Sequence, residues 1–314
     1  MIVGICIVLL IFVLLFLIGN LFYALSLNPK IDKSVIFGKK EKTKKEIESE
    51  KKASEWIQNN ATDEYITSSH NGKLKLHASV IKNKEASTVW TVVIHGYMSS
   101  NLSITEFAEH FLKLGYNVIM PDLRGHGKSE GKYIGMGYHE RLDVIDWINY
   151  ILGKNKEAKI VIFGISMGAA TTMLTIGEKL PKNVKLAICD CGYTSAWDEF
   201  KYQLKRLYKL PAFPVLYFSN FACRIWAKYS FKDASPILAI TKSVTPTLFI
   251  HGSKDTFVPF EMQDILYNAC SSKKEKLVIE GAEHAESHKI NSELYFRKID
   301  EFVNKYIDGG ENDN

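Results

Sequence analysis

Short apolar runs that alternate with amphipathic helical patterns constrain the fold of this chain more than any other feature. A short continuous apolar run between turn signals is typical of a strand buried on both faces. Such runs occupy residues 89–94, 117–120, 159–163, 184–189, 247–250 and 276–279, and residues 74–81 alternate as in a half-exposed strand. Helical patterns occupy residues 104–114, 138–152, 260–270 and 292–306, and another begins at about 166. Strands that alternate with helices predict an α/β fold with a mostly parallel central sheet and helices on both faces.

Side chains capable of chemistry follow these predicted strands. His95, Asp122, Ser166, Asp255 and His284 each come after one of the apolar runs. In open α/β sheets, ligands bind at the carboxyl ends of the strands. The sequence therefore predicts a functional site along this edge of the sheet.

Ser166 lies in the sequence Gly-Ile-Ser-Met-Gly at residues 164–168, between a predicted strand and a predicted helix. A nucleophilic serine must project from the chain so that a base and a substrate both reach its Oγ, and a sharp strand-to-helix turn provides this. The flanking glycines let neighbouring backbone pass closely, and the N-terminus of the next helix favours developing negative charge. We therefore predict that Ser166 is a nucleophile.

A serine hydroxyl attacks a carbonyl at neutral pH only when a base accepts its proton and a third group orients that base. After a strand-turn-helix nucleophile, the chain order is acid and then histidine. Asp255 lies in a turn just past a buried strand, and His284 follows the last predicted strand. We predict Asp255 as the orienting acid and His284 as the base, whereas Glu283 and Glu286 are expected to be solvated.

Acyl transfer also needs two backbone N–H groups that stabilise the oxyanion. We expect one from Met167, directly after the nucleophile, and one from Tyr97, in the loop after the strand at 89–94. His95 in the same loop is expected to be a buried structural histidine. Hydrogen bonds within a single loop are the expected role of three further polar residues, Asp122, Arg124 and His126.

Five segments together resemble the α/β-hydrolase superfamily: HGY at 95–97, DLRGHGKS at 122–129, GISMG at 164–168, HGSKDTFVP at 251–259 and GAEHAES at 281–287. The closest resemblance is to its serine-hydrolase branch, with monoacylglycerol lipases, bacterial carboxylesterases and membrane-tethered acyl-protein thioesterases. The resemblance covers about residues 73–307 and implies the α/β-hydrolase fold, a Ser166–Asp255–His284 triad, no metal and no organic cofactor. Members with an aspartate nucleophile are dehalogenases or epoxide hydrolases, and Ser166 argues against both.

The first 28 residues carry no charged side chain, and residues 2–19 are almost entirely Ile, Val, Leu and Phe. About 20 such residues cross the hydrocarbon core of a bilayer, so we expect a transmembrane anchor at 1–28. A cleaved signal peptide is the alternative. No basic residue precedes the apolar stretch, however, the stretch is long, and no clean small-residue cleavage site follows it.

Basic residues follow the apolar stretch and none precedes it: Lys30, Lys33, Lys39, Lys40, Lys42, Lys44 and Lys45. Because positively charged flanks stay on the cytoplasmic side, we expect a single-pass membrane protein whose catalytic domain faces the cytoplasm. Residues 29–62 are expected to be a charged linker, 63–307 the hydrolase domain, and 308–314 a polar tail.

Residues 192–245 form a long insertion that is rich in aromatic residues. In the superfamily that the chain resembles, insertions here usually form a cap over the nucleophile, and an aromatic cap would exclude water and bind an apolar acyl chain. Crossover helices that simply pack on the sheet remain an alternative. Between 199 and 232 basic residues outnumber acidic ones, which suits an anionic membrane surface and a solvated helix face equally.

Composition narrows the function classes further. A net charge of +5 lacks the concentrated basic stripe of a nucleic-acid binder, and the five cysteines form neither a disulfide framework nor a spaced metal site. We expect a membrane-anchored serine hydrolase that cleaves carboxylic esters of lipid-like or acylated substrates through an acyl-enzyme. An acyl-protein thioesterase or serine peptidase would use the same triad, and a catalytically inactive binding protein is the remaining alternative.

Overall fold

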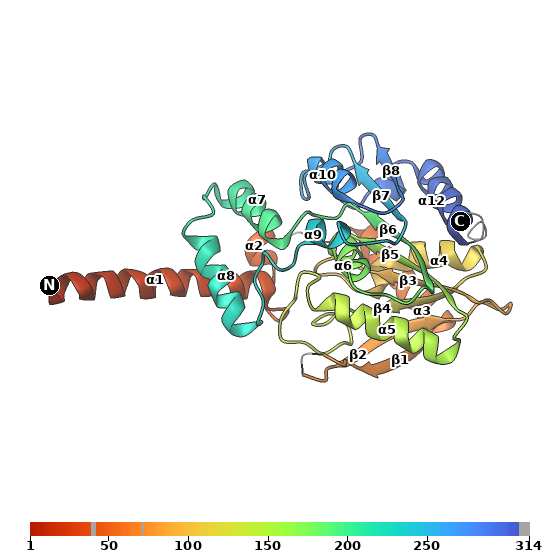
Figure 1. The fold of residues 1–314 in the computed structure, drawn as a ribbon, viewed down its shortest axis with the longest axis horizontal. Coiled ribbons are helices and arrows are strands. Elements are labelled where there is room, and N and C mark those ends of the chain that lie inside the picture. Colours follow the sequence, from red (N-terminus) through yellow and green to blue (C-terminus); the bar gives the residue numbers. More distant parts are fainter. Residues whose placement is uncertain (39–41, 71, 308–314) are drawn as a thin grey trace.

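The computed structural model of the protein describes residues 1–38, 42–70 and 72–307 (Figure 1). The polar tail predicted at 308–314 lies outside this part of the chain. A central sheet is covered by helices on both faces, and the N-terminal helix α1 (Ile2–Leu27) projects away from it (Figure 1). Within the described residues, α1 is the one helix long and apolar enough to cross a membrane.

The strands of the described residues are β1 (Thr62–Thr67), β2 (Lys75–Ile81), β3 (Val89–Ile94), β4 (Asn117–Pro121), β5 (Lys159–Ile165), β6 (Val184–Asp190), β7 (Thr247–Gly252) and β8 (Lys274–Ile279). They form one sheet in the order β1-β2-β4-β3-β5-β6-β7-β8. Strand β2 runs antiparallel to β1 and β4, and the other neighbouring strands are parallel.

The remaining helices are α2 (Ser34–Phe37), α3 (Lys44–Asn60), the 3-10 helix η1 (Asn101–Ile104), α4 (Thr105–Lys113), α5 (Glu140–Lys154), α6 (Met167–Ile176), α7 (Ala196–Tyr208), α8 (Val215–Trp226), α9 (Pro236–Ile240), α10 (Glu261–Ala269), α11 (Ser287–Ile290) and α12 (Ser292–Ile307). Successive side chains of a strand point to opposite faces, so each central strand contributes to two cores. On β3, Val92 packs with the core that includes α5 and α6, whereas Val93 packs with the core that includes α4 and α12.

The sheet is mostly parallel and has helices on both faces (Figure 1), as the sequence patterns predict. The sequence patterns do not predict β1, because this edge strand leaves most of its side chains exposed and has no apolar run. Helix α3 lies within the stretch expected to be a linker. At its N-terminus, Thr43 Oγ1 accepts a hydrogen bond from the Glu46 backbone N–H, and the Glu46 carboxylate accepts one from the Thr43 N–H. This Thr-x-x-Glu spacing is the signal in the sequence that could have predicted it.

The C-terminal end of α1 is built into the body of the protein. Leu27 is fully buried, and its carbonyl oxygen accepts a hydrogen bond from the backbone N–H of Ile134 at 2.8 Å. The Lys33 ammonium group donates to the carbonyl oxygens of Leu25 and Asn28 at 2.6 and 2.7 Å. These groups satisfy carbonyls at the helix end that have no partner within the helix. The last turn of α1 therefore belongs structurally to the folded domain.

Candidate active site

Ser166 occupies the sharp turn between β5 and α6, with φ 57° and ψ −121°. Such a conformation costs free energy for a residue with a side chain and is held by the surrounding structure. The two flanking glycines make it sterically feasible. A Cβ atom on Gly164 would lie 2.2 Å from the Gly168 carbonyl oxygen, and one on Gly168 would lie 2.2 Å from the Ile94 carbonyl oxygen. The Gly-x-Ser-x-Gly pattern is therefore a packing requirement at this turn.

The three side chains predicted as a triad lie in hydrogen-bond contact with one another. Ser166 Oγ lies 2.8 Å from His284 Nε2, and His284 Nδ1 lies 2.7 Å from Asp255 Oδ2. The residues come from the ends of β5, β7 and β8, which meet at the carboxyl edge of the sheet. In this geometry the imidazole can accept the serine proton while the carboxylate fixes its tautomer. The roles of Ser166 as nucleophile, His284 as base and Asp255 as orienting acid stay predictions, and the observed arrangement is compatible with them.

Asp255 is held as a carboxylate by a dense set of donors. Its Oδ1 accepts hydrogen bonds from the backbone N–H groups of Phe257 and Val258, both at 2.9 Å. Burial acts to raise the pKa of Asp255, but hydrogen bonds from His251 and His284 outweigh it and lower the pKa to about 2. The acid is therefore ionised across the working range of most enzymes, as an orienting carboxylate must be.

His251 is a member of the site that the sequence-based prediction missed. Its Nε2 lies 3.1 Å from Asp255 Oδ2 and 3.0 Å from the Val258 carbonyl oxygen, so the Asp255 carboxylate lies between two histidines. The residue is buried at the end of β7. Its position four residues before Asp255, in the segment HGSKD, was the available signal.

The predicted oxyanion donors lie beside the nucleophile. Met167 is the first residue of α6, and the first N–H groups of a helix have no acceptor within it. Tyr97 follows Gly96, which lies directly against the serine: a Cβ atom on Gly96 would be 3.3 Å from Ser166 Cβ. A larger residue at position 96 would push the loop away from Ser166. Both residues thus lie next to Ser166 in the chain or across from it, and their role as oxyanion donors stays a prediction.

Two histidines attach this loop to the neighbouring loop at 122–129. His95 Nε2 accepts a hydrogen bond from the Leu123 backbone N–H at 3.0 Å, and His126 Nε2 accepts one from the Met98 N–H at 3.2 Å. Burial lowers the pKa of both imidazoles, which keeps these nitrogens available as acceptors. The structural role predicted for His95 agrees with its position, since its ring is buried and its two nitrogens bond to Gly96 and Leu123.

The polar residues of the 122–129 loop bond mostly to other elements, so the prediction of hydrogen bonds within a single loop is only partly right. Asp122 Oδ2 lies 2.8 Å from His77 Nδ1 and accepts the Lys128 backbone N–H at 2.9 Å. Arg124 donates two hydrogen bonds to the buried Asp143 carboxylate, at 2.7 and 2.6 Å. These hydrogen bonds attach the 122–129 loop to β2 and to α5.

A pocket of about 700 Å³, including space open to solvent, leads from Ser166 to the N-terminal helix. Its lining is mostly apolar and comes from three regions: Phe22, Leu25, Ser26 and Ile36; Tyr97, Met136, Ser166, Met167 and Tyr193; and Glu199, Phe200, Gln203, Leu204, Leu207, Tyr208, Phe257 and Val258. Helix α7 of the insertion therefore covers the site, as the cap interpretation expects. The sequence patterns give no indication that α1 contributes to the same pocket.

Glu199 is the one acidic side chain in this lining and is 4% exposed. Its Oε1 accepts a hydrogen bond from Gln203 Nε2 at 2.8 Å, whereas Oε2 is buried without a protein partner among the described residues. Burial raises the pKa of Glu199 to about 8, so the carboxyl is neutral at physiological pH. Gln203 also donates to the Phe257 carbonyl oxygen at 2.7 Å, which links α7 to the turn that carries Asp255.

Atoms that could ligate a metal ion gather beside the triad. Cys191, Asp255 and His284 offer atoms that lie within 4.8 Å of one another. Burial raises the pKa of the Cys191 thiol well above its usual range, so the thiolate needed as a ligand is disfavoured. The facing Asp255 and His284 atoms are already hydrogen-bonded to each other. The donor set thus fits a hydrogen-bonded triad better than a metal site.

Comparisons with known proteins agree with this geometry. Residues 86–231 match the family model of serine aminopeptidase, S33. YqkD of Bacillus subtilis, an uncharacterized protein, is 31% identical over 70% of this chain and 72% of its own length. A thermostable monoacylglycerol lipase of a Bacillus species is 24% identical over 62% and 81% of the two chains. An uncharacterized membrane protein of Saccharomyces cerevisiae is 26% identical over 68% of each chain.

Among solved structures, an esterase of Pyrococcus furiosus, Pf2001, superposes with a TM-score of 0.65. The match covers 81% of this chain and 95% of the esterase at 24% identity. At this level of identity, the match shows a shared fold. The part of this chain outside the match is similar in extent to the N-terminal segment that precedes β1.

Proposed function

Because the chain belongs to the α/β-hydrolase superfamily and is a serine hydrolase of esterase type, we propose that it cleaves carboxylic esters of lipid-like or acylated substrates with a Ser166–Asp255–His284 triad. The observation that carries the proposal is the hydrogen-bonded chain from Ser166 Oγ through His284 to Asp255, which opens into a largely apolar pocket.

The proposed reaction proceeds in two halves. His284 Nε2 accepts the proton of Ser166 as Oγ attacks the substrate carbonyl carbon, and the N–H groups of Tyr97 and Met167 stabilise the oxyanion. His284 then returns the proton to the leaving alcohol, which departs and leaves the acyl group esterified to Ser166. A water molecule, deprotonated by His284, attacks this ester. The bond from the carbonyl carbon to Ser166 Oγ then breaks, His284 returns the proton to Oγ, and the carboxylic acid is released. Asp255, ionised throughout, stabilises the imidazolium that forms in each half.

The pocket supports an apolar acyl group as the part of the substrate that is recognised. Burial of each methylene group in such a lining contributes about 0.8 kcal/mol, so a long chain binds much better than an acetyl group. The similarity to a monoacylglycerol lipase points to the same substrate class. The serine aminopeptidase family model favours an amide instead, and an acyl thioester would use the same triad.

We also propose that α1 anchors the protein in a membrane with the catalytic domain in the cytoplasm. The helix has 26 residues without a charged side chain, and Lys30, Lys33 and Lys42 follow it, on the side that positive charge keeps cytoplasmic. A yeast relative is described as a membrane protein. Protease added to intact cells should then spare the catalytic domain, and digestion there would place that domain outside.

A substrate panel tests the proposed chemistry. The full-length protein would be assayed on p-nitrophenyl esters, a monoacylglycerol, an acyl thioester and an aminoacyl amide, beside Ser166→Ala and a control. The control, Ser271→Ala, removes an exposed hydroxyl that donates to the Thr241 carbonyl oxygen outside the pocket lining. We expect the largest kcat/KM on a medium- or long-chain ester, abolished by Ser166→Ala and retained by Ser271→Ala. A preference for the amide or thioester would contradict the ester assignment, and no turnover of any substrate would favour an inactive binding protein.

A further inference from the structure

The cap helix α8 lies along the part of α1 that a membrane would surround. Helix α1 rises about 1.5 Å per residue, and about 20 residues cross a hydrocarbon core of about 30 Å. Counted from Ile2, such a span ends near Asn20, and its midpoint lies near Phe12. Ring contacts and one hydrogen bond fix α8 against this half of the helix: Phe218 with Phe12 at 5.4 Å, Phe221 with Phe16 at 5.9 Å, and Trp226 Nε1 to Asn20 Oδ1 at 2.8 Å.

These contacts also set the direction of α8. Its later residues meet later residues of α1, and Figure 1 shows α8 crossing α1 at an oblique angle. At Gly19 the backbones approach so closely that a Cβ atom would lie 2.4 Å from Phe218 Cβ. The backbone of Phe218 thus lies at the level of Gly19, near the end of the span counted above, and its ring reaches back to Phe12. Helix α8 therefore lies beside the cytoplasmic end of the span, with its start on the side of the bilayer centre.

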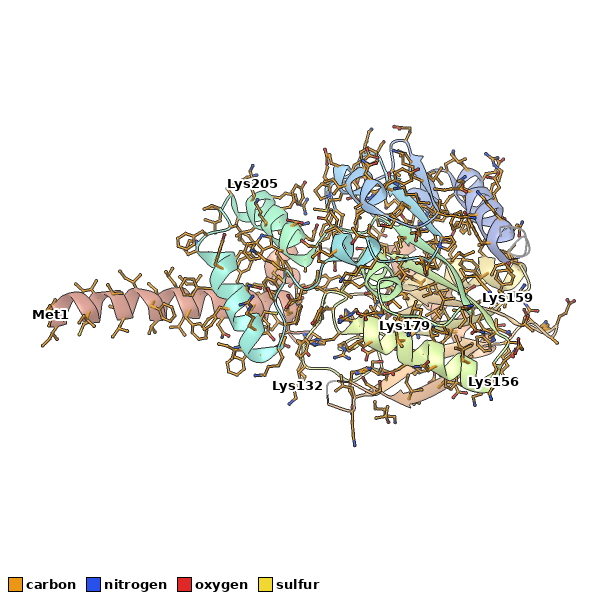
Figure 2. The ribbon with its side chains drawn as sticks, viewed as in Figure 1. Met1, Lys132, Lys156, Lys159, Lys179 and Lys205 are labelled. Atoms are coloured by element: carbon orange, nitrogen blue, oxygen red, sulfur yellow. The ribbon has the colours of Figure 1, made fainter. Side chains whose placement is uncertain are left out.

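The exposed side chains of α8 and of the turn before it are mostly aromatic. Phe213, just before the helix, is 64% exposed and Trp226, at its end, is 58% exposed, with Tyr217 and Phe221 exposed between them. Arg224 is the one charged side chain from Val215 to Trp226 and lies near the end of the helix. Lys228 follows α8 in the chain, and Lys205 lies on α7, on the side of α8 away from Met1 (Figure 2). In an interfacial membrane segment, apolar residues lie toward the bilayer centre, whereas Trp and basic residues lie nearer the membrane surface.

We propose that α8 and the turn before it are embedded beside α1 in the cytoplasmic leaflet, and that the pocket receives its acyl substrate directly from that leaflet. This inference rests on the proposed function and names the source of the substrate: a bilayer lipid, or another acyl compound whose chain is dissolved in the bilayer. Exposed aromatic side chains of the cap, which water would disfavour, are then covered by lipid.

The pocket has a wall that continues from the membrane to the nucleophile. Phe22, two residues beyond Asn20, contacts Tyr208 at the end of α7 with ring centroids 5.5 Å apart, and both side chains line the pocket. The wall continues along α1 to Ser26, whose carbonyl oxygen accepts a hydrogen bond from Tyr97 Oη at 2.5 Å. Tyr97 is the residue beside Ser166 that supplies the proposed oxyanion N–H. On this proposal, the acyl chain passes from the leaflet to Ser166 along α1 and α7.

An insertion-defective variant tests the inference. The full-length protein in phosphatidylcholine vesicles would be assayed on 1-monooleoylglycerol within the bilayer and on water-soluble p-nitrophenyl acetate. Phe213→Asp places a charge at an exposed position of the turn before α8, outside the pocket lining. Ile265→Asp is the matched control, since Ile265 is 47% exposed on α10, on another side of the molecule (Figure 1). We expect Phe213→Asp to lower kcat/KM for the embedded substrate at least about tenfold and to leave the soluble ester unchanged, with Ile265→Asp neutral on both.

A second measurement locates the cap independently of turnover. In vesicles of phosphatidylcholine brominated on its acyl chains, the fluorescence of the wild-type protein should be quenched, and Trp226→Phe should remove most of that quenching. Equal quenching of both proteins, or equal activity of Phe213→Asp and wild type on the embedded substrate, would overturn the inference. Failure of the wild type on both esters would instead contradict the proposed function, and the quenching result would still decide where α8 lies.

Discussion

Asp255 shows how single residues create the chemistry of this site. Four hydrogen-bonding groups converge on its carboxylate, two backbone N–H groups and two imidazoles. Burial raises the pKa of Asp255, but the two imidazoles outweigh it and lower the pKa to about 2. A carboxylate that remains charged in a buried position can orient His284 and stabilise its protonated form. His251 contributes to that charge balance without contacting Ser166 in any hydrogen bond of the described residues.

The first prediction concerns the cooperation of the triad. His284→Ala and Asp255→Asn should each lower kcat by about three to six orders of magnitude, and the double variant should be little worse than His284→Ala, since the three residues act as one unit. Ester hydrolysis under saturating substrate measures this. His110 and Asp300 form a comparable pair outside the site, 2.6 Å apart, so His110→Ala and Asp300→Asn serve as controls with near-normal kcat. Multiplicative losses in the double variant would show that one triad residue is misassigned.

The second prediction concerns Glu199, whose buried carboxyl keeps its proton to about pH 8 in the folded protein. An unfolded chain releases the same proton at about pH 4.3. Between these values the folded state binds more protons, so the free energy of unfolding should fall as pH rises from about 4.5 to 8. Glu199→Gln stays neutral and should remove this part of the pH dependence, whereas the exposed Glu157→Gln should leave it in place. Denaturant unfolding at several pH values measures the difference, and parallel pH profiles for wild type and Glu199→Gln would contradict the assignment.

At the scale of elements, α1 packs against α8. The helix that the sequence predicts only as a membrane anchor is therefore also part of the folded enzyme. The contact depends on a small residue at one position: Gly19 has no room for a side chain, whereas a Cβ atom on Gly4, on the same helix, would have no atom within 4 Å. The last turn of α1 then supplies pocket lining through Phe22 and Leu25. The end of α1, helix α7 of the cap and the loop that carries Tyr97 are thereby joined in one packed unit.

The third prediction follows from this packing. Gly19→Leu should force α1 and α8 apart and lower the stability of the cap by about 1–3 kcal/mol, the usual cost of overpacking. Gly4→Leu should change stability by less than about 0.5 kcal/mol, as exposed positions do. Thermal unfolding of the full-length protein in detergent, read by near-UV circular dichroism, compares the two variants. Equal unfolding temperatures would mean that α1 and α8 do not pack as described.

At the scale of the whole molecule, the sequence predicts the features that depend on hydrophobic periodicity and on turn residues, which are the buried strands and the site at their ends. Continuous apolar runs identify strands such as β3 and β5, because both faces of the sheet are buried, and residues just past these runs identify the site. The sequence does not predict edge strand β1, because only its pairing with β2 distinguishes this polar segment from a loop.

Contacts between distant segments of the chain are not predicted from the sequence for a different reason. The hydrogen bond between Asn20 and Trp226 joins residues 206 positions apart, and no local pattern in either helix indicates the other. The burial of Glu199 likewise depends on how α7 lies over the pocket, which propensity does not determine. Sequence thus indicates the chemistry of the site, and tertiary packing decides that the N-terminal helix forms one wall of it.

Labelling of the nucleophile tests the central claim, that Ser166 is the reactive serine, most directly. The full-length protein would be treated with a fluorophosphonate probe, digested, and analysed by mass spectrometry for the modified residue. We expect a single adduct on the peptide that contains Ser166, absent from Ser166→Ala and retained in the control Ser271→Ala. An adduct on another residue, or undiminished labelling of Ser166→Ala, would contradict that claim.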